Sequence, residues 1–240
     1  MKNSKAFLTA GHLKWLALIF MVIDHTAVVL IEMGIFNHQS DYSYEFLTQM
    51  VSVYEIMRNI GRLAFPIYLY LLLEGYHHTR NLKRYFTRLA FLAVVSEIPF
   101  DLAFANQPFY WDHQNVFIEL LIALLLFACL DHFKENWLMR LVSVSLCFGL
   151  AYFTMADYDL FGILAALILY FAYGNRIREA IAILPAFSFE YYMPTVFLSS
   201  LFILCYNGKR GRVQQAFHYW AYPGHILLLY LIKLMLFNTN

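Results

Sequence analysis

Several ionisable side chains of this 240-residue chain stand where the flanking sequence is almost entirely apolar. Asp24 and His25 are adjacent and lie near the middle of the apolar run 13–33. Arg58 and Arg62 stand four residues apart, a spacing that places them on one face of a helix. An ionisable group at the centre of a bilayer costs about 2.5–3.5 kcal/mol on insertion scales, so it calls for a partner or a function. These four residues are therefore the first candidates for a functional site.

The residue types define the chemistry that this group could perform. A neutral His in an apolar setting suits a general base, and an Arg beside it can stabilise an oxyanion or bind a phosphate. Neighbouring residues of a helix point about 100° apart, because the helix has about 3.6 residues per turn. We therefore expect Asp24 to pair with an Arg on a neighbouring helix rather than to form a simple triad with His25. The alternative is a buried Asp24–Arg62 ion pair whose role is purely structural.

Further polar residues stand near the ends of other apolar runs. Glu97 and Asp101 are four residues apart in the outer half of the run 85–104. Asp101 could instead cap a helix end at the outer headgroups. Glu74 and His77 lie near the inner end of another run, where His77 also fits an interfacial role. These residues extend the candidate site toward both membrane surfaces.

The elements that must position these residues are transmembrane helices. Apolar and aromatic residues make up 61% of the chain and charged residues 14%, against about 25% charged in a typical soluble domain. A bilayer core about 30 Å thick needs roughly 20 mainly apolar residues per helix. We expect an all-α polytopic transmembrane bundle that forms a single domain over residues 1–240. The runs predict nine spans, with eight or ten as alternatives, at 13–33, 56–77, 85–104, 115–130, 137–153, 158–174, 177–189, 193–207 and 219–237.

The seventh and eighth runs, 177–189 and 193–207, are shorter than a typical span. Pro185 and Pro194 stand within them, and Pro ends or bends a helix. These two runs therefore predict either a pair of half-helices or one bent span.

The basic residues predict the orientation of the chain. Fourteen of the 17 Lys and Arg residues fall in alternate loops, which are the cytoplasmic ones under the positive-inside rule. Because Lys2, Lys5 and Lys14 precede or begin the first span, we expect a cytoplasmic N-terminus and, with nine spans, an external C-terminus. The segment 34–53 has no Lys or Arg and carries acidic residues, which predicts a long acidic outer loop.

Composition also excludes several classes of partner. The chain has 17 Lys and Arg residues against 16 Asp and Glu residues, so no basic field exists to bind nucleic acid. The three Cys residues stand singly inside apolar runs, which indicates neither disulfides nor a zinc site. We expect no metal centre.

The candidate residues lie within sequence strings that closely resemble the TraX family. The strings are LKWLALIFMVIDHTAVVL, NIGRLAFPIYLYLLLEGYHHTRNLKRYFTRLAFLAVVSEIPFD, QNVFIEL, YDLFGILAALILYF, LFILCYNGKRG and YWAYPGHILLLYL. The resemblance covers nearly the whole chain, from about Leu13 to Leu231. TraX proteins are polytopic inner-membrane proteins named for acetylation of the N-terminus of conjugative pilin. They are similar to the acyltransferase-3 enzymes, which deliver acyl groups from cytoplasmic acyl-CoA to acceptors on the other face.

The resemblance implies a multi-pass acetyltransferase of the bacterial cytoplasmic (inner) membrane. The acyl donor would be acetyl-CoA. The acceptor would be an extracytoplasmic amine or hydroxyl of a protein terminus, a polymer, a lipid or a small amine. Glu97 stands where the family commonly has an uncharged residue, so its alternative role is to tune the choice of acceptor. The implied catalytic residues are Asp24, His25 and Arg62, and the implied binding residues are Glu74, His77, Arg80, Arg84, Glu97, Asp101, Asn115, Arg210, Tyr222 and His225.

The expected mechanism begins with acetyl-CoA at the cytoplasmic face, where its phosphates are attracted by basic side chains, namely Arg80, Lys83, Arg84, Lys209, Arg210 and Arg212. Its pantetheine arm passes Glu74 and His225 and brings the thioester to His25. His25 removes a proton from the acceptor, Arg62 offsets the developing negative charge, and Asp24 holds Arg62 or fixes the His tautomer. Direct transfer and an acetyl-His intermediate are both compatible with the sequence. A proton-coupled secondary transporter that uses the same charges is the main alternative, and a catalytically silent assembly scaffold is another.

Overall fold

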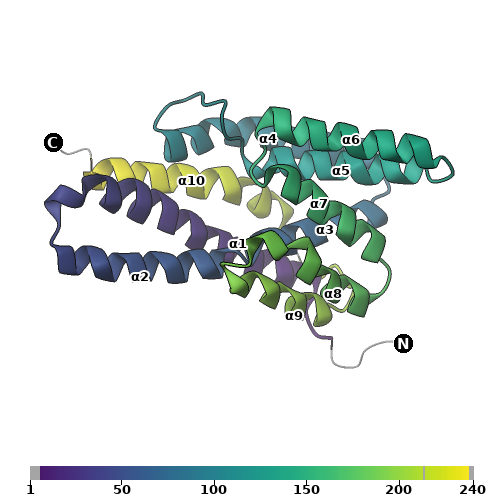
Figure 1. Ribbon diagram of the computed structural model, residues 1–240, viewed down its shortest axis with the longest axis horizontal. Coiled ribbons are helices and arrows are strands. Elements are labelled where there is room, and N and C mark those ends of the chain that lie inside the picture. The colour runs from purple at the N-terminus through teal and green to yellow at the C-terminus, as the bar shows by residue number, and fades with distance from the viewer. Residues whose placement is uncertain (1–5, 213, 238–240) are drawn as a thin grey trace.

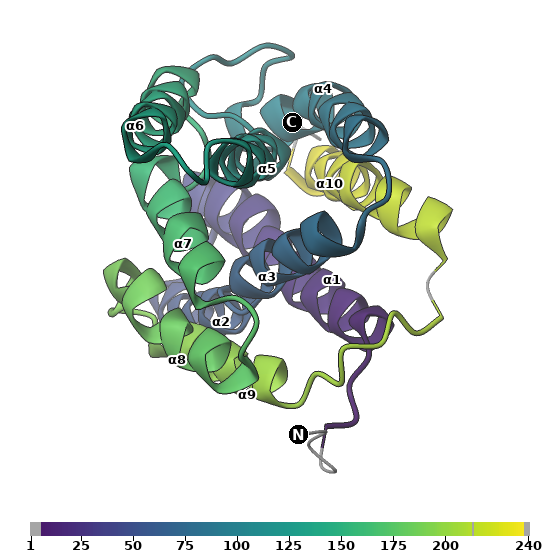
Figure 2. The ribbon, with the colours of Figure 1, turned by 90° about the vertical axis from the view of Figure 1, so that its right-hand side faces the viewer.

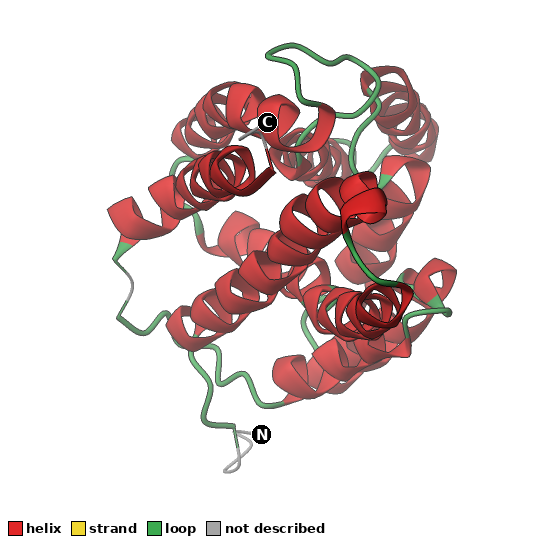
Figure 3. Cartoon of the chain, turned by 90° about the vertical axis from the view of Figure 1, so that its left-hand side faces the viewer, coloured by secondary structure: helices red, strands yellow, loops and turns green. Residues whose placement is uncertain are grey.

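The computed structural model describes residues 6–212 and 214–237, and every regular element within these ranges is a helix (Figures 1 and 3). The all-α prediction is therefore confirmed, while Lys2 and Lys5 lie outside the described residues. The α-helices are α1 (Ala10–Thr26), α2 (Tyr44–Gly61), α3 (Ala64–His78), α4 (Leu82–Ala105), α5 (Val116–His132), α6 (Trp137–Thr154), α7 (Asp159–Ala172), α8 (Arg176–Ala186), α9 (Ser199–Leu204) and α10 (Gln215–Phe237). A π-helix, η1 (Ala27–Ile35), continues α1, and short 3-10 segments are η2 (Phe36–Asp41), η3 (Ser188–Glu190) and η4 (Pro194–Leu198).

Long apolar helices make this chain a multi-pass membrane protein. Four helical segments are long and apolar enough to cross a bilayer: Ala10–Asp41, Tyr44–His78, Trp137–Thr154 and Ala216–Phe237. Each has at least 18 residues, close to the length that a bilayer core about 30 Å thick requires. The count of nine spans and the orientation of the N-terminus stay predictions.

Short polar side chains begin most of the helices. Each accepts a hydrogen bond from a backbone N–H in the first turn, which satisfies one of the donors that a helix start leaves free. The capping residues are Thr9 for α1, Ser43 for α2, Asn81 for α4, Asn115 for α5, Asn136 for α6 and Asn175 for α8. Local sequence therefore fixes where these helices start.

The segment predicted as an acidic outer loop is largely helical, and that prediction is wrong. η2 and α2 occupy most of it, and Ser43 caps α2 by accepting from the N–H of Phe46 at 3.3 Å. The prediction weighed only the missing Lys and Arg residues, although the helix itself is amphipathic. α2 and α3 follow one another closely and run alongside α1 and η1 in the opposite direction (Figure 1).

The short seventh and eighth runs form two half-helices, which settles the two alternatives for this part of the chain. α8 and the η4–α9 segment each contain 11 residues, or about 16 Å of helix, so neither reaches across a bilayer core. They pack against each other as a hairpin whose tip carries Glu190 (Figures 1 and 2). A hairpin of two half-helices is tolerated at membrane depth where protein surrounds its tip.

Helix α3 lies at the centre of the bundle and organises the core (Figure 2). Ten of its 15 residues are buried, and it packs against α1, α5, α7 and α9. At one end of the bundle the start of α1 lies beside the segment that precedes α10. The N–H of Ala10 donates to the carbonyl of Lys209 at 2.9 Å, and that of Gly11 donates to Arg210 at 3.0 Å. The two segments are therefore held together through their backbones.

Candidate active site

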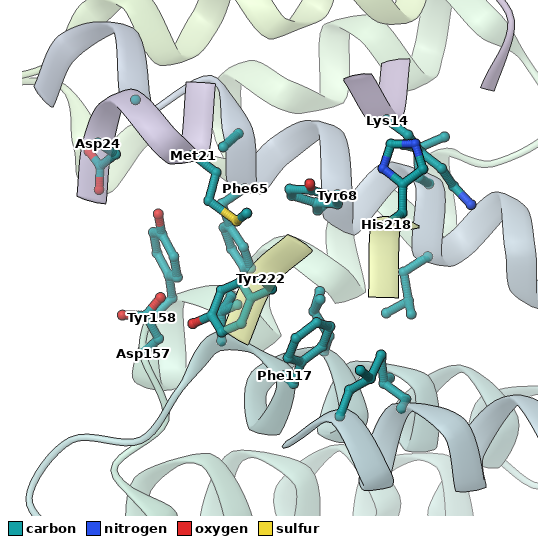
Figure 4. A pocket seen from close by; sticks show the side chains of 18 of the residues that line it. Lys14, Met21, Asp24, Phe65, Tyr68, Phe117, Asp157, Tyr158, His218 and Tyr222 are labelled. Carbon is teal, nitrogen blue, oxygen red and sulfur yellow. The ribbon is translucent and has the colours of Figure 1, made fainter. Parts of the chain in front are cut away.

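One cavity of about 1300 Å³ runs between α1, α3, α4 and α10 and joins two charged regions. At one end, which we call the basic end, it is lined by Lys14, Arg80, Arg88 and Arg210. At the other, which we call the paired end, it is lined by Asp24, Arg58, Arg62, Asp157 and Glu190. Figure 4 shows Lys14 and His218 on one side of the cavity and Asp24, Asp157 and Tyr158 on the other. Apolar and aromatic side chains line the middle, among them Met21, Tyr68, Leu72, Phe117 and Tyr222.

The cations of the basic end have no carboxylate partner among the residues that the structure describes. Within the described ranges, no carboxylate forms a salt bridge with Lys14, Arg80, Arg88 or Arg210. One of these cations also lies over an aromatic ring, since the Arg88 guanidinium is 6.0 Å from the centroid of the Tyr219 ring. Four uncompensated cations beside aromatic rings form a setting suited to a polyanionic ligand that carries a planar base.

At the paired end, Asp24 and Arg58 form an ion pair. Nη1 of Arg58 lies 2.5 Å from Oδ2 of Asp24, and the two side chains are 15% and 18% exposed. The prediction that Asp24 pairs with an Arg of a neighbouring helix is therefore confirmed, but Arg62 as that partner is wrong. Arg62 instead forms an ion pair with Glu190 at 3.2 Å, and its Nη1 also donates to the Tyr158 hydroxyl at 3.5 Å.

The close approach of α1 to α2 depends on Gly61. A Cβ atom built on Gly61 would lie 2.3 Å from both Cβ and Oδ1 of Asp24. This is far inside van der Waals contact, which for carbon atoms is about 3.5–4.0 Å. Only a residue without a side chain allows the Asp24 carboxylate to lie against the end of α2, one turn from Arg58.

His25 lines the cavity and contacts His225 of α10. Nδ1 of His25 lies 2.7 Å from Nε2 of His225, and Nδ1 of His225 lies 2.6 Å from the carbonyl oxygen of Ala221. The two rings are nearly parallel, with centroids 5.0 Å apart and an interplanar angle of 4°. Phe104 and Tyr222 meet the His25 ring edge-on. His225 itself is not among the lining residues that the structure describes, so it lies behind His25 rather than on the path of a ligand.

The π-helix η1 begins two residues after His25. Single π-turns are frequently found at functional sites, and η1 is unusually long at nine residues. Asp24 of α1 and Val28 and Glu32 of η1 all line the cavity, since residues four apart lie on one face of a helix. The Tyr54 hydroxyl donates to Glu32 at 2.5 Å. The irregular helix thus carries acidic side chains along one wall of the cavity.

The loop between α4 and α5, at the top of Figures 1 and 3, brings His113 to the paired end. Its Nε2 lies 2.9 Å from Oδ1 of Asp157, and both residues line the cavity. The hydrogen bond to Asp157 raises the pKa of His113 above 6.5, although partial burial of the ring opposes this shift. His113 can therefore carry a positive charge at a higher pH than an isolated imidazole can.

Three of the predicted binding residues form a separate group. The Asn115 side chain donates to Glu97 and to the carbonyl of Ala93 at 2.9 Å, and it caps α5. Asp101 accepts from the N–H of Tyr110 at 2.9 Å. Glu97, Asp101 and Asn115 hold the α4–α5 loop, and none of them is among the described residues that line the cavity.

The remaining predicted residues divide between the cavity and the helix ends. Glu74, Arg80, Arg210 and Tyr222 line the cavity, whereas His77 and Arg84 do not. Glu74 accepts from the hydroxyls of Tyr70 at 3.2 Å and Tyr206 at 3.1 Å, deep in the bundle. His77 stacks on the ring of Tyr173, with centroids 3.9 Å apart.

Several residues of the cavity are absent from the predicted catalytic and binding residues. Arg58 was among the first candidates but was not assigned a role, although it is the residue that pairs with Asp24. Glu190 stands between Pro185 and Pro194, and an acidic residue flanked by apolar sequence was the signal that could have found it. Asp157 offered no comparable signal, because it stands in a short turn between two apolar runs.

The fold and the cavity define the class of this protein. It is a helical membrane protein with a cavity that has free cations at one end and buried ion pairs beside a His pair at the other. The described residues contain no group of three or more His, Cys, Asp or Glu side chains that could hold a metal ion. The family model for TraX protein matches residues 10–233, and the chain belongs to the TraX family.

The comparisons also identify a relative. A probable fimbrial assembly protein FimC (serogroup H1) of Dichelobacter nodosus is 28% identical over 257 residues, which cover 95% of this chain and 97% of that protein. No solved structure is significantly similar to this chain. The similarity therefore extends over nearly the whole length of both proteins.

Proposed function

We propose that this protein is an acetyltransferase of the bacterial inner membrane that uses acetyl-CoA from the cytoplasm. It transfers the acetyl group to an amine or hydroxyl acceptor at the outer face. The observation that carries the proposal is one cavity that joins His25 and two Arg residues to four cations without a salt bridge to any described carboxylate. TraX membership and the acyltransferases that the family resembles support the same reaction.

The basic end suits the nucleotide portion of acetyl-CoA. Lys14, Arg80, Arg88 and Arg210 lie in the loops and helix ends that the positive-inside rule assigns to the cytoplasm. Lys14 and His25 are 11 residues apart on α1, which is about 16 Å along the helix axis. An extended pantetheine arm covers this distance through the apolar middle of the cavity and brings the thioester to His25.

The paired end suits the chemical step. The acceptor, which enters as a cationic amine, first releases one proton to water, and its neutral nitrogen then attacks the thioester carbon. A C–N bond forms, and the C–S bond breaks. Nε2 of His25 takes the proton of the nitrogen and delivers it to the departing thiolate, so that the products are an amide and the free thiol of CoA. Arg62 keeps an Nη2 group without a hydrogen-bond partner among the described residues, and this donor offsets the oxyanion that forms during attack.

The charge of the paired end favours an amine over a hydroxyl as the acceptor. Asp24 and Glu190 are neutralised by Arg58 and Arg62, but Glu32, Asp157 and Asp159 also line the cavity. No Lys or Arg of the described chain forms a salt bridge with these three carboxylates. An excess of negative charge attracts a cationic amine. The name of the relative, a fimbrial assembly protein, favours the N-terminus of a fimbrial subunit as that amine.

The test is acetyl transfer by purified protein in detergent. Radiolabelled acetyl-CoA is incubated with a short peptide that has a free N-terminus and with the same peptide blocked at that position. We expect label in the free peptide with the wild type and a loss of about 10²–10⁴-fold in His25→Ala, the contribution typical of a general base. His132→Ala is the matched control, since His132 is exposed at the end of α5 and does not line the cavity.

Acetyl-CoA binding gives a second measurement that does not depend on the acceptor. Lys14→Ala and Arg210→Ala should each weaken binding in a calorimetric titration, whereas Lys134→Ala, an exposed cation away from the cavity, should leave it unchanged. A well-folded wild type that does not bind acetyl-CoA at millimolar concentration would refute the proposal.

A further inference from the structure

We propose that His225 is the positioning residue of this site, because it holds His25 in the tautomer whose Nε2 is free to act as the base. This role rests on the acetyl transfer proposed above. It differs from the contact with the acyl donor that the sequence predicts for His225. The proposal follows from a chain of two hydrogen bonds that ends at a backbone carbonyl.

The carbonyl oxygen of Ala221 decides the first step. It lies 2.6 Å from Nδ1 of His225, and a carbonyl oxygen can only accept a hydrogen bond. Nδ1 of His225 must therefore carry the proton. In a neutral imidazole one nitrogen donates and the other accepts, so Nε2 of neutral His225 is an acceptor.

This acceptor decides the second step. Nε2 of His225 lies 2.7 Å from Nδ1 of His25, so Nδ1 of His25 must be the donor. The remaining nitrogen of neutral His25, Nε2, then has no proton. Within the described chain Nε2 also has no hydrogen-bond partner, and His25 lines the cavity. The two hydrogen bonds thus leave Nε2 of His25 unprotonated on a side chain that lines the cavity.

The surrounding contacts keep the pair in register. The ring planes of His25 and His225 are nearly parallel, as the hydrogen bond between them requires. Phe104 and Tyr222 each make an edge contact with the His25 ring. Asp24 does not take this orienting role, because its ionised Oδ2 is held by Arg58 on the neighbouring helix. In hydrolases a carboxylate orients the catalytic imidazole. Here a second imidazole on α10 is placed to do so.

The experiment reads the tautomer of His25 directly. Protein labelled with ¹⁵N-histidine is measured by NMR in detergent, and the His25 signals are assigned by their loss in His25→Ala. Protonated and bare ring nitrogens differ widely in ¹⁵N shift. We expect His25 in the wild type to be protonated at Nδ1, which is the minor tautomer of a free histidine side chain in water. His225→Ala should move the proton to Nε2, and His225→Gln, whose amide oxygen can accept from Nδ1, should restore the wild-type pattern.

Kinetics give the matching readout. His225→Ala should lower kcat by about 10- to 100-fold, a part of what a general base contributes, and leave the KM for acetyl-CoA within about twofold. His225→Gln should recover most of the lost kcat, and His132→Ala should change neither constant. Circular dichroism and thermal unfolding identify any variant that fails to fold, and His225→Gln then decides the question.

The outcomes separate this inference from the proposed function. If His25 of the wild type is protonated at Nε2, or if His225→Ala leaves the His25 tautomer or kcat unchanged, the positioning role is overturned. If the wild type transfers no acetyl group while the tautomer pattern is as expected, the proposed reaction fails and the geometry of the His pair stands.

Discussion

Replacing Gly61 with Ala tests whether the geometry of the paired end is set by the contact between α1 and α2. The added Cβ would lie 2.3 Å from Cβ and Oδ1 of Asp24, so either the two helices separate or the Asp24 carboxylate moves away from Arg58. Overpacking of this kind costs typically 1–3 kcal/mol. The gain in helix propensity from Gly to Ala is at most about 1 kcal/mol in a helix interior and is smaller at Gly61, which ends α2.

The chain offers a matched control at Gly149 of α6, where an added Cβ meets no atom within 4 Å. Gly149→Ala should gain the propensity term alone, about 0.5–1 kcal/mol. The difference between the two variants is therefore dominated by the steric cost of about 1–3 kcal/mol, with a smaller part from the lower propensity gain at Gly61. The steric cost alone corresponds to about 2–12 °C in Tm for a chain of this size.

The assay is thermal unfolding of both variants in the same detergent, together with acetyl transfer. We expect Gly61→Ala to unfold below the wild type and to lose transfer activity because the Asp24–Arg58 pair is displaced. Gly149→Ala should unfold at or above the wild-type temperature with unchanged activity. If Gly61→Ala were as stable as Gly149→Ala, the close approach at Gly61 would not exist and the reasoning about the ion pair would be refuted.

Three further predictions follow from individual contacts. Glu190→Gln should destabilise the protein by about 1–3 kcal/mol, less than a fully buried pair loses, because the Arg62 side chain is 15% exposed. In a double-mutant cycle of unfolding free energies, the additional change Arg62→Gln should restore part of this loss, and strictly additive effects would argue against the pair. The raised pKa of His113 means that its contact with Asp157 stabilises fully below pH about 6.5 and is lost as the pH rises through the raised value. Wild-type Tm should therefore fall more steeply between pH 6 and 8 than that of Asp157→Asn, and equal slopes would contradict the assignment. Asn115→Ala should lower the free energy of chemical unfolding by about 2–4 kcal/mol, since it removes a helix cap and leaves buried acceptors without a donor. A loss below the roughly 1 kcal/mol of an ordinary cap would show that the bonds from the Asn115 amide to these acceptors do not stabilise the protein.

The sequence determined the class of the protein and its local structure. The low share of charged residues requires an apolar surrounding, and the apolar runs agree with the observed helices over most of the chain. Asn115 and Asn175 mark helix starts because a short polar side chain satisfies the first backbone donors wherever it stands. Asp24 and His25 were found because no neighbouring residue explains an ionisable group at mid-membrane.

Only the tertiary structure decided which of these residues meet. Helical spacing placed Arg58 and Arg62 on one face but could not say which of them reaches Asp24, since one turn of sliding between helices exchanges the two. His25 and His225 are 200 residues apart in the chain and are brought together by the packing of α10 against η1 and α1. Glu190 enters the site because a half-helix hairpin turns back inside the bundle. Which side chains meet across two helices depends on how the whole faces of those helices pack, and a local sequence pattern does not predict this.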